Sequence, residues 1–365
     1  MKVVHVITGL GTGGANTMLL RLLEAGLRHG LAGQPEVVSL TGRGALGDAV
    51  EALGVPLHCL DARHPALSPV YLARLVAILR RARPDLVQGW MVHGNLAATF
   101  GTLLGWRSRR PPVLWNIRQS FYDPSHETPL TARLIRLAAR WSRRPAAILY
   151  NSQVACRHHV AIGYDVSRAL VVPNGFDTEW LRPDPEARRS VRHELDLAET
   201  VPLVGLVGRY HPVKDHAGFV SAMARVAEQH PDLHLLLVGP GVTPEQPELV
   251  RQLETAGLLS RTRLLGPRPD VARLDAALDV AVCSSYTEAF ANVVAEAMAC
   301  GVPCAVTDVG ESAIIVGDTG EVVPPQDPKA LAAAVSRLLA LPIEDRRELG
   351  RRARRRIVET YSLEG

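Results

Sequence analysis

The sequence predicts an α/β protein made of two successive halves, each built on a parallel, doubly wound sheet. Short runs rich in Val, Ile and Leu alternate with longer stretches of helical apolar spacing along the 365 residues. Hydrophobic residues make up 47% and charged residues 21%, a balance typical of chains with a buried core. The alternation breaks once, at Pro173-Asn174-Gly175-Phe176-Asp177, and this break predicts the domain boundary.

Seven runs of the first half are expected to be strands: Val3–Thr8, Glu36–Leu40, Pro56–Leu60, Leu86–Gly89, Val113–Ile117, Ala146–Tyr150 and Leu170–Val172. Helical patterns lie between them over Thr17–His29, Leu67–Ala82 and Thr131–Ser142. The second half adds Leu203–Val207, Leu233–Val238, Thr262–Leu265, Val280–Cys283, Pro303–Thr307 and Glu321–Val323. Because strands and helices alternate, both sheets should be parallel and covered on both faces.

The two halves differ in charge, so different partners are expected for domains 1–173 and 174–365. Up to Pro173 there are 20 Lys and Arg against 9 Asp and Glu, whereas the rest has 21 against 28. No apolar run is long enough to span a membrane, and Lys2 leads straight into a predicted strand, so a cytoplasmic location is expected. Aromatic residues do not interleave with the basic ones, which disfavours nucleic acid. The five cysteines form no C-x-x-C pair and are expected to be reduced thiols.

A glycine-rich run follows the first predicted strand. Gly9-Leu10-Gly11-Thr12-Gly13-Gly14 satisfies G-x-G-x-x-G and opens a helix, so its backbone N–H groups are able to approach an anion or a sugar. A tight strand-to-helix turn with positive φ is the alternative interpretation. A nicotinamide cofactor would also need an acid at the end of the second strand, about 20 residues on. Glu36 begins that strand instead, which disfavours NAD.

Two basic residues, Arg209 and Lys214, lie between a predicted strand and a predicted helix of the second half. They are expected at the carboxyl edge of the sheet, where open α/β folds bind ligands. A guanidinium fork and an ammonium group stabilise the charge that builds on a departing diphosphate. Two solvated surface cations are the alternative.

Two glutamates, Glu288 and Glu296, follow the strand Val280–Cys283. Glu288 is expected in the turn after this strand and Glu296 two turns into an apolar helix, where a carboxylate is costly unless paired or bound. Carboxylate oxygens accept hydrogen bonds from a ribose diol or from sugar hydroxyls. A glycosidase carboxylate pair and an Arg-paired core glutamate are the alternatives.

In combination these motifs resemble the retaining glycosyltransferases of family 4, a group with the GT-B fold of two Rossmann-like domains facing across a cleft. The resemblance covers nearly the whole chain. It rests on Gly13-Gly14-Ala15, Pro173–Asp177, Gly208-Arg209 with Lys214, and the Glu288/Glu296 pair followed by Ala297-Met298-Ala299-Cys300-Gly301-Val302-Pro303.

The resemblance implies that 174–365 binds a nucleotide-sugar and 1–173 an acceptor. It assigns Arg209 and Lys214 to the diphosphate, Glu288 to the donor sugar and Glu296 to the ribose. Backbone groups of Leu265 to Arg268 would line the base, and helix-start amides would contact the phosphates. The implied donor site also includes Gly13, Gly14, Gly266, Arg268, Phe290, Ala291, Asn292, Val293 and Val294.

The chain departs from the family pattern at three places. Asn16 stands where members frequently have Glu, and Arg118 stands where many have a histidine after the fifth strand. His93 is the one histidine in a comparable position, so Arg118 and His93 are both expected on the acceptor side, among the catalytic residues. The chain stops at Gly365, so the helix that usually crosses back to the first domain is expected to be short or missing.

The resulting prediction is a retaining hexosyltransferase that uses a UDP-sugar, or alternatively a GDP-sugar, in cell-surface polysaccharide or lipopolysaccharide synthesis. No D-x-D pair occurs, so neither metal nor cofactor is expected. The acceptor is expected to be a saccharide or lipid-linked, reached at an anionic membrane surface through the arginines of 131–144. A sugar-nucleotide epimerase or hydrolase, an NAD oxidoreductase and a non-catalytic binding module are the alternatives.

Overall fold

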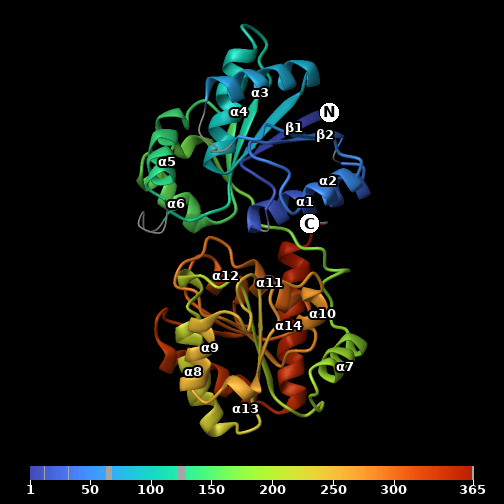
Figure 1. Cartoon of the computed structure of the whole chain (residues 1–365), viewed down its shortest axis with the longest axis vertical. Helices are drawn as coiled ribbons and strands as arrows, with labels where there is room; N and C mark the ends of the chain where they lie inside the picture. Colours follow the sequence, from blue (N-terminus) through green and yellow to red (C-terminus); the bar gives the residue numbers. More distant parts are fainter. Residues whose placement is uncertain (12, 32, 63–67, 122–127, 364–365) are drawn as a thin grey trace. The chain divides into compact units, whose positions relative to one another are not determined.

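The computed structural model describes residues 1–11, 13–31, 33–62, 68–121 and 128–363. The chain divides into two compact units, Met1–Pro173 and Asn174–Gly365 (Figure 1). Each unit contains one sheet, of seven strands in the first unit and six in the second, and the recorded strand pairs are parallel. The expected α/β class with two doubly wound domains is therefore confirmed.

The sheet of unit 1 has the order β3-β2-β1-β4-β5-β6-β7. The chain builds outward from β1 to β3, then returns to place β4 on the other side of β1, so the topological switch point lies between β1 and β4. The strands are β1 (Lys2–Ile7), β2 (Gln34–Ser39), β3 (Leu57–Cys59), β4 (Leu86–Trp90), β5 (Val113–Ile117), β6 (Ala147–Tyr150) and β7 (Ala169–Val171). The helices are α1 (Gly14–Arg28), α2 (Gly47–Ala52), α3 (Pro69–Ala82), α4 (Met91–Gly105), α5 (Pro129–Trp141) and α6 (Gln153–Ala161).

Unit 2 repeats this topology with the order β10-β9-β8-β11-β12-β13, so its switch point lies between β8 and β11. Its strands are β8 (Leu203–Val207), β9 (His234–Val238), β10 (Thr262–Leu264), β11 (Val280–Cys283), β12 (Cys304–Thr307) and β13 (Glu321–Val323). Its helices are α7 (Pro185–Glu194), α8 (His216–Gln229), α9 (Pro247–Thr255), α10 (Val271–Asp275), α11 (Asn292–Ala299), α12 (Ser312–Val316), α13 (Pro328–Ala340) and α14 (Ile343–Tyr361).

Helices cover both faces of the sheet of unit 2 (Figure 1). Helices α8, α9 and α13 enclose one apolar cluster, which includes Phe219, Leu249 and Leu338. Helices α10, α11 and α14 enclose the other, which includes Met298 and Ile357. Most residues of the central strands β8, β9, β11 and β12 are therefore buried, which explains why these strands read as continuous apolar runs.

The thirteen expected strands are all present, with ends that differ by a residue or two. Helix α4 was not predicted from the sequence, because nearly all of its sides are buried. Leu96, Ala97 and Ala98 are buried together with Thr99 and Thr102. Without a polar face it lacks the periodicity by which amphipathic helices are recognised.

The arginine-rich stretch of α14 is only partly the solvated helix face expected from its composition. Arg354 donates to the carbonyls of Ala299 (2.6 Å) and Leu181 (2.7 Å), and Arg356 donates to Ile315 O (2.8 Å). These guanidinium groups cap the carbonyl ends of α11 and α12, whose last carbonyl groups have no partner inside the helix. The stretch is therefore partly a solvated face and partly a contact with neighbouring helices.

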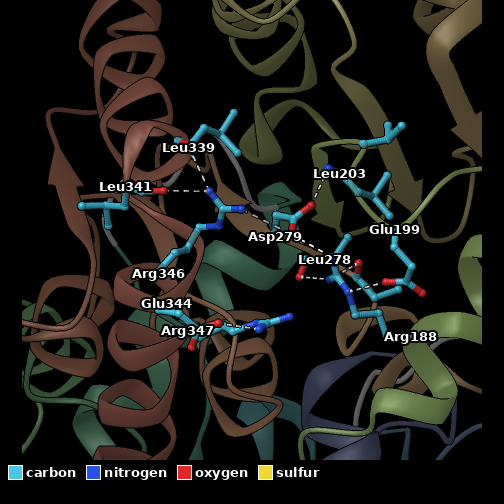
Figure 2. Close-up of polar contacts among 12 residues, drawn as sticks. Arg188, Glu199, Leu203, Leu278, Asp279, Leu339, Leu341, Glu344, Arg346 and Arg347 are labelled. Carbon is cyan, nitrogen blue, oxygen red and sulfur yellow. Dashed lines mark hydrogen bonds and ion pairs between the residues drawn. The ribbon is translucent and has the colours of Figure 1, made fainter.

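A buried polar centre joins α7, β8 and α14 around Asp279 (Figure 2). The Asp279 carboxylate accepts from Arg188 Nη2 (3.0 Å), from Arg192 Nη2 (2.7 Å) and from the Leu203 amide (2.9 Å). Arg346 Nη2 lies 3.8 Å from the same carboxylate. Groups from elements that are distant in the sequence thus all interact with the Asp279 carboxylate. These donors and positive charges offset the cost of removing the carboxylate from water.

Candidate functional site

The first group of candidate site residues lies at the carboxyl edge of the sheet of unit 2, where the loops after β8 and β11 meet at the switch point. The Tyr286 amide donates to Val213 O (3.0 Å), and Ser284 Oγ donates to Lys214 O (2.8 Å). These bonds attach the β11 loop to the β8 loop. They place the basic and the acidic motif next to each other, as the sequence predicted from their strand-end positions.

Lys214 and Glu288 form an ion pair through Lys214 Nζ and Glu288 Oε1. Ser285 Oγ donates to the same oxygen at 2.8 Å. Burial lowers the pKa of Lys214, but the neighbouring Glu288 carboxylate outweighs it, so the net pKa is raised and the group stays an ammonium. The pair lies near Arg209, which is exposed at the end of β8 and adds a second positive charge. This edge therefore combines cations for an anion with a carboxylate for hydroxyl groups.

Glycines let the backbone of neighbouring loops come close at this edge. A Cβ on Gly310, whose φ is +58°, would lie 2.6 Å from Glu288 O, and a Cβ on Gly239 would lie 2.2 Å from Gly208 O. No other residue fits at such distances without moving the loops. The loop after β12 thus packs closely against the backbone of the loop that carries Glu288.

Glu296 is buried on α11, with 9% of its surface exposed. The helix begins at Asn292, so Glu296 lies one turn into it and the expected two turns are wrong. Asp275 on α10 is buried nearby, and neither of its carboxyl oxygens has a hydrogen-bond partner among the described residues. Burial, and then the Glu296 carboxylate, raise the pKa of Asp275 well above its ordinary value.

At the start of α11, fewer backbone amides are free to bind phosphate groups than the sequence predicted. The Asn292 amide donates to Phe290 O (3.0 Å) and the Val294 amide to Ala291 O (3.1 Å). In the part of the chain that the structure describes, the Val293 amide is the one of these three without a backbone acceptor. Asn292 Oδ1 accepts from Asn174 Nδ2 of the linker at 2.5 Å, so the predicted boundary motif anchors this helix start.

Two other predicted donor residues have side chains committed elsewhere. The Phe290 ring is buried in the core beside Phe176, with ring centroids 6.1 Å apart. Arg268 pairs with Asp270 through two hydrogen bonds of 2.8 and 2.7 Å and reaches Glu194 at 3.1 Å. Only their backbone groups are therefore available to a ligand.

Gly266, between Leu265 and Arg268, has a φ of +63° and bonds by its amide to Val242 O (2.8 Å). Its carbonyl accepts from the Gly239 amide at 2.8 Å. Two loops of the carboxyl edge, after β9 and β10, are joined at this glycine. The segment Leu265 to Arg268, predicted to line the base, thus begins at the carboxyl edge directly after β10.

In unit 1, the glycine-rich run lies at the switch point after β1. Gly9, Gly11 and Gly13 all have φ outside the left-handed region, so the interpretation as a turn that needs positive φ is wrong for them. Gly9 is needed for space, because a Cβ there would lie 2.5 Å from Thr41 Oγ1. Gly13 caps α1, Gly14 is its first residue, and no side chain caps this helix start. Thr12 lies outside the described residues.

Asn16, which departs from the family pattern, closes the same loop. Its Nδ2 donates to Gly11 O at 3.0 Å. A glutamate has no donor for this bond, so Asn16 stabilises the glycine-rich loop in a different way.

Arg118 and His93 lie at the same edge, on the adjacent strand and helix. The Arg118 guanidinium stacks over the Trp90 ring, 5.4 Å from its centroid, and its Nε donates to Asn116 Oδ1 (2.6 Å). Burial lowers the pKa of Arg118 to about 10, so it remains charged at neutral pH. His93 is half-buried in the first turn of α4, and burial lowers its pKa. Both are placed where a ligand above β1 and β4 would meet them.

Comparison with known proteins identifies the family. Residues 12–180 match the model described as Glycosyltransferase Family 4, and residues 201–341 match Glycosyl transferases group 1. The chain belongs to the family 4 glycosyltransferases.

Curated relatives of this family 4 chain include D-inositol 3-phosphate glycosyltransferases. That of Corynebacterium urealyticum is 33% identical over 190 residues, which cover 49% of this chain and 45% of the relative. That of Mycobacterium tuberculosis is 31% identical over 225 residues, covering 60% and 46%. The matched part thus spans about half the length of these relatives.

Solved structures confirm the GT-B fold. HepE of Anabaena, in complex with UDP and glucose, has a TM-score of 0.85 at 21% identity, covering 99% of this chain and 96% of that one. Sucrose-phosphate synthase of Thermosynechococcus elongatus has a TM-score of 0.81 at 22% identity, covering 100% and 96%. At these identities the likeness concerns the fold.

The sequence motifs did not single out several polar residues that the structure shows to be hydrogen-bonded or buried. Ser285 holds Glu288, and Ser120 Oγ lies 2.7 Å from His158 Nδ1 beyond β5. His216, the first residue of α8, is buried with no hydrogen-bond partner for either ring nitrogen among the described residues, and burial lowers its pKa to about 4. A lone Ser or His carries no sequence signal, although the position directly after a strand would have singled out Ser285.

Glu36, which disfavoured NAD, lies within β2 and pairs with Lys2 Nζ at 2.7 Å. Among the described residues, no three His, Cys, Asp or Glu side chains are arranged to hold a metal ion. Within those residues, no helix is both long enough and apolar enough to cross a membrane. All five cysteines are free, and Cys283, Cys300 and Cys304 are buried.

Proposed function

We propose that the protein transfers a sugar from a UDP-sugar to a saccharide or lipid-linked acceptor with retention of configuration. The observation that carries this proposal is the Lys214–Glu288–Ser285 cluster at the switch point of unit 2. It supplies an ammonium group for a diphosphate and a carboxylate for sugar hydroxyls on one edge. UDP is favoured because HepE, which shares the fold, is described in complex with UDP and with UDP-glucose.

In the proposed reaction the bond between the anomeric carbon and the diphosphate oxygen breaks while the acceptor hydroxyl attacks the same face. The acceptor proton passes to the departing phosphate oxygen. Arg209 and Lys214 stabilise the charge on that diphosphate without a metal or a cofactor. Glu288 orients the donor sugar, Glu296 holds the ribose, and His93 and Arg118 line the acceptor side.

The test measures turnover of UDP- and GDP-sugars in EDTA and determines the product anomer by NMR. Arg209→Ala should lower turnover by raising the activation free energy by about 2–4 kcal/mol, because a charged contact to the transition state is lost. Arg225→Ala, an exposed arginine of α8, is the matched control and should leave turnover unchanged. A folded Arg209→Ala variant with the parent rate would contradict the donor site. Release of UDP without a glycosylated product would favour the hydrolase or epimerase alternative.

We further propose that α5 approaches an anionic membrane to reach a lipid-linked acceptor. Arg133, Arg136, Arg140, Arg143 and Arg144 are exposed on and after this helix and make no ion pair among the described residues. Leu130 and Leu137 beside them are 50% and 41% exposed. Each basic residue near such a surface contributes about 1 kcal/mol, so binding should be reversible and sensitive to salt.

Co-sedimentation with phosphatidylglycerol vesicles tests this contact. Charge reversal at Arg136, Arg140 and Arg144 should abolish pelleting at low salt without changing donor affinity. Reversal at the exposed Arg189 and Arg225 of unit 2 serves as the control. Equal recovery of the α5 variant and the parent would assign these arginines to an ordinary solvated face.

A further inference from the structure

A pocket of about 530 Å³ lies in unit 1 at the amino ends of β4 and β5. The turn between α3 and β4 forms one wall, and the segment between α4 and β5 forms the other. Its volume is in the range of small-molecule sites, which is about 300–1,000 Å³. Strand β4 has five residues, so this pocket is about 16 Å from the carboxyl edge that carries the candidate site. It therefore belongs to a different site.

Four arginines line the pocket: Arg80, Arg83, Arg109 and Arg110. None of them forms an ion pair among the described residues. One acid, Asp85, also lines the pocket and accepts from the Lys2 amide at 2.7 Å, so the four arginines outnumber the acids of the lining by three. By contrast, Arg188 and Arg192 of unit 2 are paired with the Asp279 carboxylate. Four like charges around one hollow repel one another unless an anion neutralises them.

Two of these side chains are held in place by the backbone of the pocket itself. Arg80 Nε donates to Gly105 O (2.8 Å), and Arg110 Nε donates to Trp106 O (2.9 Å). Their terminal nitrogens make no hydrogen bond within the described part of the chain, so each presents a fixed pair of donors. A guanidinium group oriented in this way suits bidentate binding of phosphate oxygens.

The other two arginines occupy strained backbone positions. Arg83 and Arg109 have φ values of +49° and +48°. The left-handed conformation is unfavourable for a residue with a Cβ, whereas glycine adopts it freely. Arg83 ends α3 in this conformation as its C-cap, so the positive φ that no helix end explains is that of Arg109.

We propose that this pocket binds a small phosphorylated molecule at a site separate from the donor site. The guanidinium groups would hold its phosphate oxygens. The half-buried Trp106 ring, with Pro84 and Pro111, would form an apolar wall for its organic part. A soluble ligand is favoured over a lipid surface because the cations converge on a hollow of limited volume.

Calorimetric titration of the full chain with inorganic pyrophosphate tests the proposal. The parent for this titration carries Arg209→Ala and Lys214→Met, so that any binding at the donor edge is removed whether or not that edge binds nucleotides. Adding Arg83→Gly and Arg109→Gly removes two cations and also relieves the backbone strain. This variant should bind pyrophosphate at least about tenfold more weakly. Its melting temperature should be equal or higher, which excludes misfolding as the cause.

The matched control is Arg74→Ala with Arg81→Ala, two exposed arginines of α3 outside the pocket, and it should bind as the parent does. A parent that does not bind pyrophosphate would overturn the proposal, as would equal affinity in the glycine variant. A glycine variant that loses only phosphatidylglycerol vesicle binding would also overturn it, because the arginines would then serve a lipid surface.

Discussion

The Lys214–Glu288 pair allows a prediction whose size follows from the structure. The two side chains are 21% and 14% exposed, so the pair is neither a surface contact nor a fully buried one. Exposed pairs contribute about 0–1 kcal/mol, whereas removal of one partner from a buried pair costs about 3–5 kcal/mol. Lys214→Met leaves Glu288 with the hydrogen bond from Ser285 Oγ. We therefore expect this variant to lose about 2 kcal/mol of the free energy of unfolding of unit 2.

A double-mutant cycle isolates the pair. Glu288→Gln keeps the acceptor for Ser285 and removes only the charge, and the double variant should lose about 1–2 kcal/mol less than the sum of the single variants. Urea unfolding read by hydrogen exchange on peptides from β8 and β11 measures these energies for unit 2. Lys329→Met, at an exposed lysine of α13, is the matched control and should be neutral.

The pH dependence of this coupling has a defined sign. The pKa of Lys214 is raised above its ordinary value of 10.5, so the stabilisation is complete below that value and is lost as the pH rises through the raised pKa. Additive single variants at neutral pH, or a coupling that does not change at strongly alkaline pH, would refute this account of the ion pair.

Two further predictions concern buried acids of unit 2. Asp279→Ala should cost about 3–5 kcal/mol, because Arg192, whose side chain is 1% exposed, would lose its counter-charge. Its urea midpoint is compared with that of Asp318→Ala, which removes an exposed pair and should cost about 0–1 kcal/mol; equal midpoints would contradict the prediction. Because burial raises the pKa of Asp275, the parent should lose stability as the pH rises above 3.8, the ordinary Asp value. Asp275→Asn should remove this slope in pH-dependent melting, and an unchanged slope would show that another group causes it.

The alternation of strands and helices was predictable because it depends on local residue patterns. Runs such as Leu203–Val207 are apolar on both faces since helices cover both sides of the sheet, and the break at Pro173 to Asp177 contains the start of unit 2 at Asn174. The expected positions of Lys214 and Glu288 also followed from the sequence. Both residues lie in the segments that follow β8 and β11, and parallel strands end at one edge.

The contacts within that edge were decided only by the tertiary structure. Lys214 and Glu288 are 74 residues apart, and their pairing depends on β11 returning to the side of β8. The same holds for the raised pKa of Asp275 beside Glu296, and for the arginines of α14 that cap other helices. Residue patterns record which side chains are apolar or charged along the chain. Burial and charge pairing depend on neighbours that only the folded chain brings together, and they determine which arginine is a structural cap and which is free to bind an anion.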